Sequence, residues 1–125
     1  MQKLLFEEKW DKTIADTDRT RIEQIFQKAN IQKTNKLFIP IRQAINHKQD
    51  LLVTVLIHNL NNSSIHFSNK SLSYYEDDIR VAEYTFTLPS LSVEPNTSMP
   101  WTFIFPNKSL HAYPTLKNGE LIVKK

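Results

Sequence analysis

The stretches DLLVTVLIHNLN (Asp50–Asn61) and NTSMPWTFIFP (Asn96–Pro106) decide the fold of this 125-residue chain. Both are dense in β-branched and aromatic residues and end in turn-forming residues, which is typical of β-strands. The first carries apolar side chains on both faces, which predicts a central strand covered by a helix or a loop on its second face. In the second, large aromatic residues alternate with other side chains, and we expect the aromatic side to face the core, with Trp101 only partly buried.

Further strand candidates are shorter, namely Lys36–Ile45, Ser64–Phe67, Ser71–Tyr75, Ile79–Leu88 and the segment around Leu91 and Val93. Pro40 cannot donate a ladder hydrogen bond, so we expect the first of these to be an edge strand or to carry a bulge. Asn61-Asn62-Ser63 is predicted to turn the chain, since asparagine tolerates positive φ. Asn118-Gly119 predicts a short C-terminal hairpin within residues 108–125. Strands of this length and spacing over about 36–106 predict a mainly β fold, an antiparallel immunoglobulin-like β-sandwich.

One amphipathic helix is predicted before these strands, over about residues 17–29. Asp16 is the expected N-cap, and the helix should end near Asn30. An apolar stripe with i, i+3, i+4, i+7 spacing is formed by Ile22, Ile25, Phe26 and Ala29. We expect this stripe to cover part of the sheet; binding of a partner or a membrane surface is the alternative. Leu4–Phe6 predicts a short first strand, with Trp10 packing nearby.

Composition limits the class of protein. A length of 125 residues suits a single domain, here residues 1–125, and 40% hydrophobic residues suffice for a packed core. The formal charge of +3 comes from scattered basic residues, which argues against nucleic-acid binding. No cysteine is present, so disulfides, thiolate metal sites and cysteine nucleophiles are excluded. The start MQKLLFEEKW is no signal peptide and no apolar run is long enough to span a bilayer, which predicts a cytoplasmic protein if Met1 is native.

No reactive constellation is recognisable. His58 and His66 flank the Asn61–Ser63 turn and would face each other only across a three-residue loop. Two histidines without a carboxylate or thiolate make a poor metal site, so we interpret them as ordinary surface or rim histidines. Glu76-Asp77-Asp78 lacks the spaced oxygens and the glycine of a calcium loop, so we interpret it as a solvated turn. Three carboxylates lie at predicted strand ends or on strand faces, namely Asp50, Glu83 and Glu94. None of them has a companion motif for acid–base catalysis.

Nucleotide binding is disfavoured too, because Gly119 is the single glycine and no serine lies in a nucleophile motif. The sequence therefore predicts no catalytic residues, no cofactor-binding residues, no cofactor and no metal ligands.

Four phrases resemble a known family as a set: LLFEEKW at 4–10, IEQIFQKA at 22–29, FIPIRQAINHKQDLLVTVLIHN at 38–59 and FTLPSLSVEPNTSMPWTFIFP at 86–106. Together they resemble the SLAP domain of Bacillus-type Firmicutes, over about Leu4 to Leu110. The domain is named for the accessory Sec system S-layer assembly protein, in which it is duplicated, whereas this chain carries one copy. The resemblance implies a role near the export or assembly of surface proteins, and no catalytic residues.

Two functions follow as hypotheses. The preferred one is a non-enzymatic protein-binding module linked to accessory Sec export or S-layer protein assembly, with a secreted surface-protein precursor or an accessory Sec component as partner. An edge strand could accept a strand from such a client, and the candidate edges are the Pro40 strand and the Pro100–Phe105 strand. The alternative is that the two prolines serve to prevent such pairing. The alternative is a wall-associated or extracellular adhesive immunoglobulin-like domain. Neither nucleic-acid binding nor membrane insertion is expected.

Overall fold

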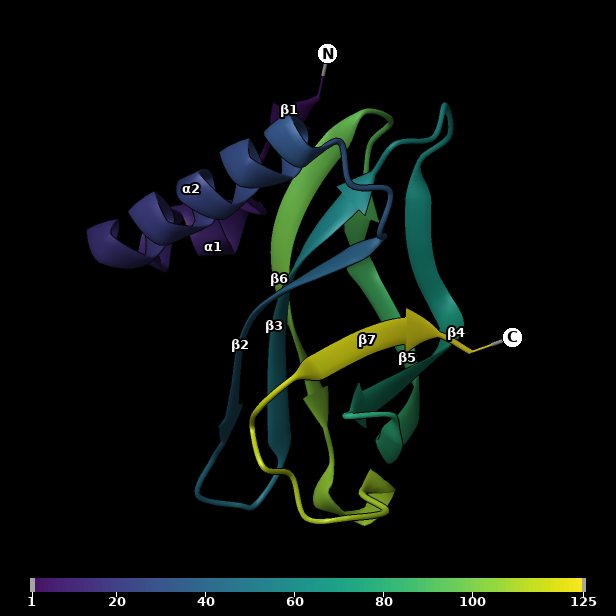
Figure 1. Cartoon of the computed structure of the whole chain (residues 1–125). Helices are drawn as coiled ribbons and strands as arrows, with labels where there is room; N and C mark the ends of the chain where they lie inside the picture. Colours follow the sequence, from purple (N-terminus) through teal and green to yellow (C-terminus); the bar gives the residue numbers. More distant parts are fainter. Residues whose placement is uncertain (1, 125) are drawn as a thin grey trace.

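The computed structural model describes residues 2–124, which form two β-sheets and an N-terminal pair of helices (Figure 1). The elements, in chain order, are β1 (Lys3–Leu4), α1 (Glu8–Thr13), α2 (Asp16–Gln32), β2 (Phe38–Ile45), β3 (Leu51–Asn59), β4 (Ile65–Glu76), β5 (Ile79–Val93), β6 (Thr97–Phe105), the 3-10 turn η1 (Asn107–Ser109) and β7 (Gly119–Val123). The predicted mainly β sandwich with an N-terminal amphipathic helix is confirmed.

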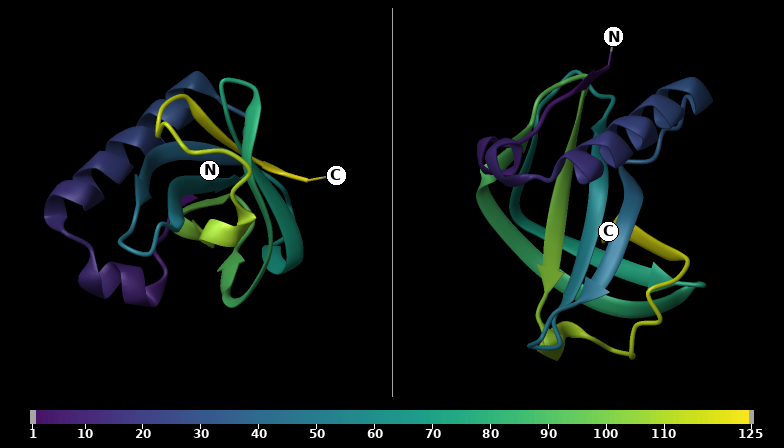
Figure 2. Two further views of the ribbon diagram at one scale, coloured as in Figure 1. Left: turned by 90° about the horizontal axis from the view of Figure 1, so that it is seen from below. Right: turned by 90° about the vertical axis from the view of Figure 1, so that its left-hand side faces the viewer.

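The first sheet has the order β1-β6-β3-β2 and the second the order β5-β4-β7. The strands of both sheets pair antiparallel except β1, which runs parallel to β6 over Lys3 and Leu4. In the two further views the sheets face each other and the helices lie outside the first sheet (Figure 2). The second face of β3 is thus covered by a helix, as its apolar residues on both faces predict.

The core lies between the two sheets. Val53, Val55 and Ile57 of β3 point into it and are at most 1% exposed. Phe103 and Phe105 of β6 are fully buried beside them, and Phe86 of β5 packs edge-on against both rings, with centroids 5.3 and 5.1 Å away. This edge-to-face arrangement is the one that aromatic quadrupoles favour. The inward direction predicted for the aromatic residues of β6 is therefore correct.

The helix α2 is longer than predicted and its ends differ. Its N-cap is Ala15, which makes no side-chain cap bond, and its C-cap is Lys33 in the left-handed conformation, instead of Asp16 and Asn30. Of the predicted stripe, Ile22 and Ala29 are buried. A sheet residue, Leu56 on the outer face of β3, is fully buried as well, which fits coverage by the helices.

The short helix α1 was not predicted. The carboxylate of Glu7 caps it by accepting the backbone N–H groups of Lys9 and Trp10 at 2.6 and 3.3 Å. Arg19 of α2 then ties the two helices together, since its guanidinium lies 2.9 Å from the carboxylate of Asp11 and 4.6 Å from the centroid of the Phe6 ring. Local capping and this pair of contacts fix where Trp10 lies.

The strand β2 behaves as Pro40 predicts. It is the edge of its sheet, and its register with β3 shifts between Pro40 and Arg42. Two other predictions for the strands are wrong. The separate strands 64–67 and 71–75 form the single strand β4, and Ile79–Leu88 continues through Leu91 into the single strand β5. The pairing of β4 with β5 contains register shifts, so residues that interrupt the strand alternation are accommodated within each strand.

The predicted hairpin within residues 108–125 is wrong, because β7 pairs with β4 and not with a neighbouring tail segment. The chain does bend at Asn61-Asn62-Ser63, between β3 and β4, as predicted. The reason given for this turn is wrong, because these residues do not have positive φ, whereas Asn69, Asn96 and Asn118 do. Gly119 itself has no positive φ. A glycine fits here because there is no room for a side chain: a Cβ would lie 2.7 Å from Cε1 of the Tyr74 ring.

Candidate functional site

The two histidines considered for a metal site lie in different sheets. His58 belongs to β3 and is 3% exposed, so the prediction of a surface or rim histidine is wrong for it, while His66 of β4 is exposed. The Nδ1 atom of His58 lies 2.6 Å from Oγ of Ser98, and burial lowers the pKa of His58. Over residues 2–124, no group of three potential ligands among His, Cys, Asp and Glu comes together.

Glu76 is not part of a solvated turn. It is 4% exposed, and its carboxylate accepts four hydrogen bonds. The donors are the hydroxyl of Tyr74 at 2.8 Å, the backbone N–H and hydroxyl of Thr115 at 2.7 and 3.0 Å, and the backbone N–H of Leu116 at 2.9 Å. Burial alone would raise the pKa of Glu76, but these bonds outweigh it and the pKa is lowered. The same burial and the Glu76 carboxylate raise the pKa of Tyr74. The cluster anchors the C-terminal segment to β4.

Of the three carboxylates considered for acid–base chemistry, two are held by structural partners and the third is exposed. Asp50 accepts the backbone N–H of Asn107 at 2.9 Å, which joins the loops at the end of the first sheet. Glu83 lies 2.8 Å from the Lys124 ammonium and 3.0 Å from the Arg80 guanidinium, and the hydrogen bond from Lys124 lowers its pKa. Glu94 is exposed. The structure brings none of them together for acid–base chemistry.

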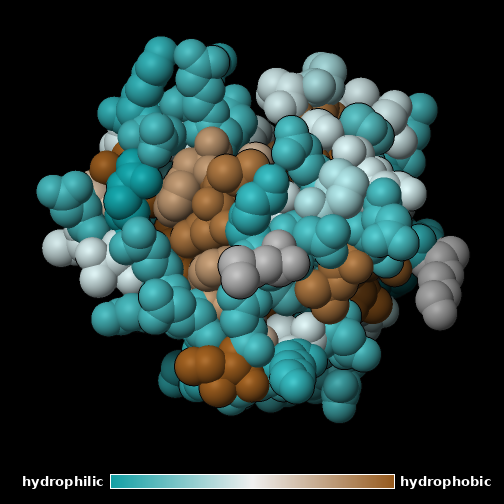
Figure 3. Space-filling view, turned by 90° about the horizontal axis from the view of Figure 1, so that it is seen from above, coloured by the Kyte–Doolittle hydropathy of each residue, from teal (hydrophilic) through white to brown (hydrophobic). Residues whose placement is uncertain are grey.

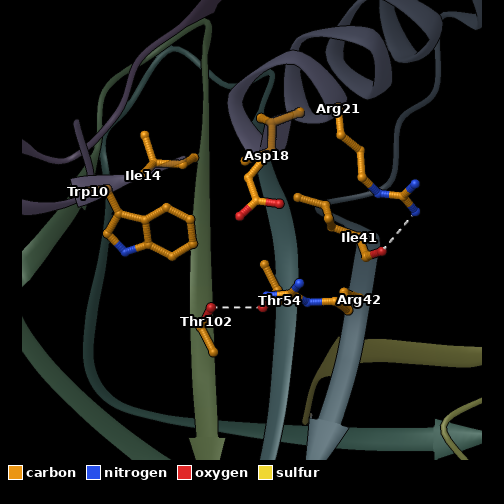
Figure 4. A pocket seen from close by; sticks show the side chains of 9 residues that line it. Trp10, Ile14, Asp18, Arg21, Ile41, Arg42, Thr54 and Thr102 are labelled. Carbon is orange, nitrogen blue, oxygen red and sulfur yellow. Dashed lines mark hydrogen bonds between the residues drawn. The ribbon is translucent and has the colours of Figure 1, made fainter. Parts of the chain in front are cut away.

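A cleft of about 80 Å³ opens where the helices meet the outer face of the first sheet (Figure 4). Its floor is the hydroxyl pair of Thr54 and Thr102, whose oxygens are 2.8 Å apart. The walls are formed by the apolar side chains of Trp10, Ile14, Ile22 and Ile41. The charged side chains of Asp18, Arg21 and Arg42 lie at the mouth. Within the described chain these three charged residues form no ion pair.

Trp10 extends from this cleft around the edge of β6. Its ring stacks on that of Trp101, with centroids 6.4 Å apart and planes at 25°. Sequence reasoning predicted packing of Trp10 near the first strand but missed its partner and the cleft. The i, i+4 spacing of Trp10 and Ile14 was the available signal, since it places both on one helical face. Apolar surface also reaches solvent on the end of the molecule that carries β1 and α2, as a brown area among hydrophilic side chains (Figure 3).

The edge of β6 next to Trp10 is mostly unpaired. β1 pairs with Thr97 and Ser98 alone. The N–H groups of Lys3 and Leu5 donate to the carbonyls of Asn96 and Ser98, both at 2.9 Å. Backbone groups along a strand alternate with period two, so those of Pro100, Thr102 and Ile104 point to the same edge. In residues 2–124 no strand pairs with them beyond Ser98, but Pro100 is buried and the Trp10 ring lies against Trp101 beside this edge.

The comparisons with known proteins give one family. The family model for the SLAP domain matches residues 4–121 of the 125. This chain belongs to the SLAP domain family. The match extends past the Leu110 boundary of the sequence resemblance and ends within β7. Neither the curated proteins nor the solved structures gave a match. SLAP domains are non-catalytic modules, and among the described helices none has the length and apolar character to cross a membrane.

Proposed function

We propose that this SLAP domain is a non-catalytic protein-binding module that acts in the accessory Sec export or the assembly of surface-layer proteins. The observation that carries the binding role is the apolar cleft between the helices and the outer face of the first sheet, next to backbone groups of Thr102 and Ile104 that no strand pairs. Free backbone donors and acceptors next to apolar side chains are what an extended client segment needs in order to dock. The link to export and assembly rests on membership of the SLAP family and on the role that this resemblance implies.

The buried polar groups support a structural role over a catalytic one. The carboxylate of Glu76 accepts hydrogen bonds from four donors, and Nδ1 of His58 is hydrogen-bonded to the hydroxyl of Ser98. A general acid or base must instead reach a substrate proton. Among the described residues, every buried side-chain nitrogen or oxygen has a hydrogen-bond partner, so none is held in reserve for a substrate.

Co-elution tests the function directly. The purified domain is mixed with a surface-layer protein precursor that retains its signal sequence, or with purified accessory Sec components, and passed over a sizing column. We expect a complex with at least one of these partners. The mature surface-layer protein without its signal sequence is the matched control for recognition of the precursor. Absence of a complex with every partner would contradict the proposed role.

The place of action is part of the proposal. We place the domain in the cytoplasm, where it would meet precursors before export, and the alternative is a wall-associated or extracellular adhesive domain. Fractionation of the producing cells separates the two, using an antibody against the folded domain. Recovery in the cytoplasmic fraction agrees with the export role, and recovery in the wall or the medium favours the adhesive alternative.

A further inference from the structure

We propose that the part of the first sheet that the helices leave uncovered binds an amphipathic helix of a partner protein, with apolar residues toward the sheet and acidic residues on its flanks. This surface, the open row, consists of Ala44 on β2, Leu52 on β3 and Ile104 on β6. The inference rests on the proposed protein-binding function and assigns it a contact surface and a class of partner.

The three residues of the open row lie side by side on the outer face of the sheet. Ala44 pairs with Leu52, and Leu52 pairs with Ile104, so they form one line across three strands. Leu52 points away from the core, to the same face as Thr54 and Leu56, because every second residue of a strand shares a face. The side chain of Ile104 is 50% exposed, and Ala44 and Leu52 are partly exposed. The line is therefore an apolar surface that solvent reaches.

The helical layer stops short of the open row. α2 crosses the upper part of β6, β3 and β2, and their lower part has no helix in front of it in the right-hand view of Figure 2. Burial along β3 follows this division, since Leu56 is fully buried, Thr54 is 9% exposed and Leu52 is more exposed than both. An apolar sheet face is normally covered by a second layer. A partner helix placed below α2 would complete that layer.

The outer face of the second sheet differs, because its side chains are mostly polar and bond to one another. The hydroxyls of Ser71 and Thr85, which are paired across β4 and β5, are 2.7 Å apart. The exposed Ile122 of this face lies opposite Ser73. An antiparallel sheet with such a polar face is stable in contact with water. Three apolar residues in one line distinguish the open row from this face.

The spacing of the open row fits a helix that crosses the strands, as α2 does. Neighbouring strands are about 4.8 Å apart, so Ala44 and Ile104 are separated by about 10 Å across the sheet. Residues i, i+4 and i+7 of a helix share one face, and the first and last of them are about 10.5 Å apart along its axis. Three such apolar residues would contact the three strands at once. An added strand fits less well, because Trp10 stacks on Trp101 beside β6 and β2 is bulged at Pro40.

The cleft next to the open row would take a further side chain of the partner helix. Its floor, Thr54 and Thr102, is the neighbouring row of the same sheet face. Its volume of about 80 Å³ suits one aliphatic side chain. Trp10 is one of its walls, so that side chain would contact the indole ring without displacing it.

Charge around the open row favours acidic flanks on the partner. Arg42 lies at the mouth of the cleft, and Lys48 and Lys108 lie in the loops below the row. All three are exposed and form no ion pair within residues 2–124. The nearby carboxylates are those of Asp18 and Asp50, and that of Asp50 already accepts a backbone N–H from the loop after β6. The surroundings are thus net positive and complement an acidic helix.

The first experiment uses the synthetic peptide Ac-Ala-Glu-Glu-Leu-Glu-Ala-Ala-Leu-Glu-Glu-Leu-Ala-Glu-Ala-NH2 and isotope-labelled protein observed by NMR. We expect the signals of Ala44, Leu52 and Ile104 to shift at millimolar peptide, while those of Thr85 and Ile122 on the second sheet stay in place. A peptide of the same composition, with its leucines spread around the helix, is the matched control and should bind about tenfold more weakly. Unchanged signals of the open row, or equal binding of the two peptides, would overturn the inference.

Charge and self-association are tested with the same signals. A peptide with lysine in place of every glutamate should bind about tenfold more weakly than the acidic one, and added salt should reduce this difference. Equal binding of both peptides would contradict the acidic partner. If the signals of the open row move with protein concentration alone, and the mass doubles from 14.7 kDa, the row binds a second copy of this chain and the inference is wrong.

Matched variants locate the contact. Ile104→Thr keeps a β-branched side chain, removes most of its apolar surface, and should weaken binding of the acidic peptide by about fivefold or more. Ile79→Thr makes the same change at an isoleucine that is 61% exposed on β5, and should leave binding within about twofold. Loss of binding with Ile79→Thr, or none with Ile104→Thr, would overturn the inference. If Ile104→Thr does not fold, the signals of the unmodified protein still decide.

The proposed function can fail separately. If the acidic peptide binds at the open row but no surface-layer precursor or accessory Sec component co-elutes, the export role is wrong and the inference about the open row stands. If a precursor co-elutes equally with the unmodified domain and with folded Ile104→Thr, the inference about the open row is wrong and the binding function stands.

Discussion

Replacing Glu76 by glutamine should unfold the anchor of the C-terminal segment while changing almost no volume. One carboxylate oxygen accepts both donors of Thr115, and the other accepts the Tyr74 hydroxyl and the Leu116 N–H. Glutamine puts an amino group, which cannot accept, at one of these positions. Two donors in a nearly buried site then lose their acceptor, and the remaining two face a neutral oxygen.

The magnitude follows from these four bonds. A hydrogen bond to a charged group contributes about 1.5–3 kcal/mol net, and a buried donor without a partner costs about 1–3 kcal/mol. Allowing for relaxation, we expect Glu76→Gln to lower the free energy of unfolding by about 3–5 kcal/mol. Glu94→Gln is the matched control, because Glu94 is exposed, and it should change that free energy by no more than about 0.5 kcal/mol.

Urea unfolding followed by circular dichroism measures both variants. The pH dependence gives a second reading. The pKa of Glu76 is lowered from its ordinary value of 4.5 in the folded protein, so its contribution is present above that pH and is lost as the pH falls through the folded pKa. The gap between the unmodified protein and Glu76→Gln should therefore narrow in acid. A gap below about 1 kcal/mol at neutral pH, or one that stays constant in acid, would refute the reasoning.

Three further predictions concern the core. Gly119→Ala should destabilise by about 1–3 kcal/mol in urea unfolding, because its Cβ would lie 2.7 Å from the Tyr74 ring; an unchanged midpoint would contradict this. Phe103→Ala should cost about 3–5 kcal/mol, whereas Ile104→Ala, at a side chain 50% exposed, should cost under about 1 kcal/mol, and equal effects would mean that the faces of β6 are wrongly assigned. The pKa of His58 is lowered from 6.5, so stability should begin to fall as the pH drops below that value, and His58→Gln should flatten this part of the curve.

The strands with strong local patterns were predictable from sequence. β3 and β6 carry enough β-branched and aromatic residues for alternation alone to assign their faces, and Pro40 correctly marked an edge with a bulge. The longer strands β4 and β5 were predicted as fragments. Pro89 lies between the two segments predicted as separate strands, but β5 is an edge strand and tolerates a missing N–H. Positive φ at Asn69 likewise sits within a shift of register and not at a strand end.

Contacts between distant segments could not be predicted. Glu76 looks like part of an acidic turn until Thr115 and Leu116, about 40 residues later, bring three donors to it. The prediction for the C-terminal strand was wrong for the same reason, since the Asn118-Gly119 pattern fits a hairpin as well as it fits the start of a strand beside β4. Trp10 belongs with these cases, because its partner Trp101 lies in the last long strand.

Little of the backbone at the strand edges of this SLAP domain is open to pairing. Folded β-proteins commonly cover or block their strand edges, and here β1, Trp10, β7 and the segment around His111 cover most of them. What remains on β6 is long enough for only a few hydrogen bonds. Backbone pairing alone would then give weak and unselective binding, since every peptide carries the same backbone groups. Any selectivity in pairing at this edge would therefore have to come from side chains beside it, and the apolar cleft over Thr54 and Thr102 is the nearest group of such side chains.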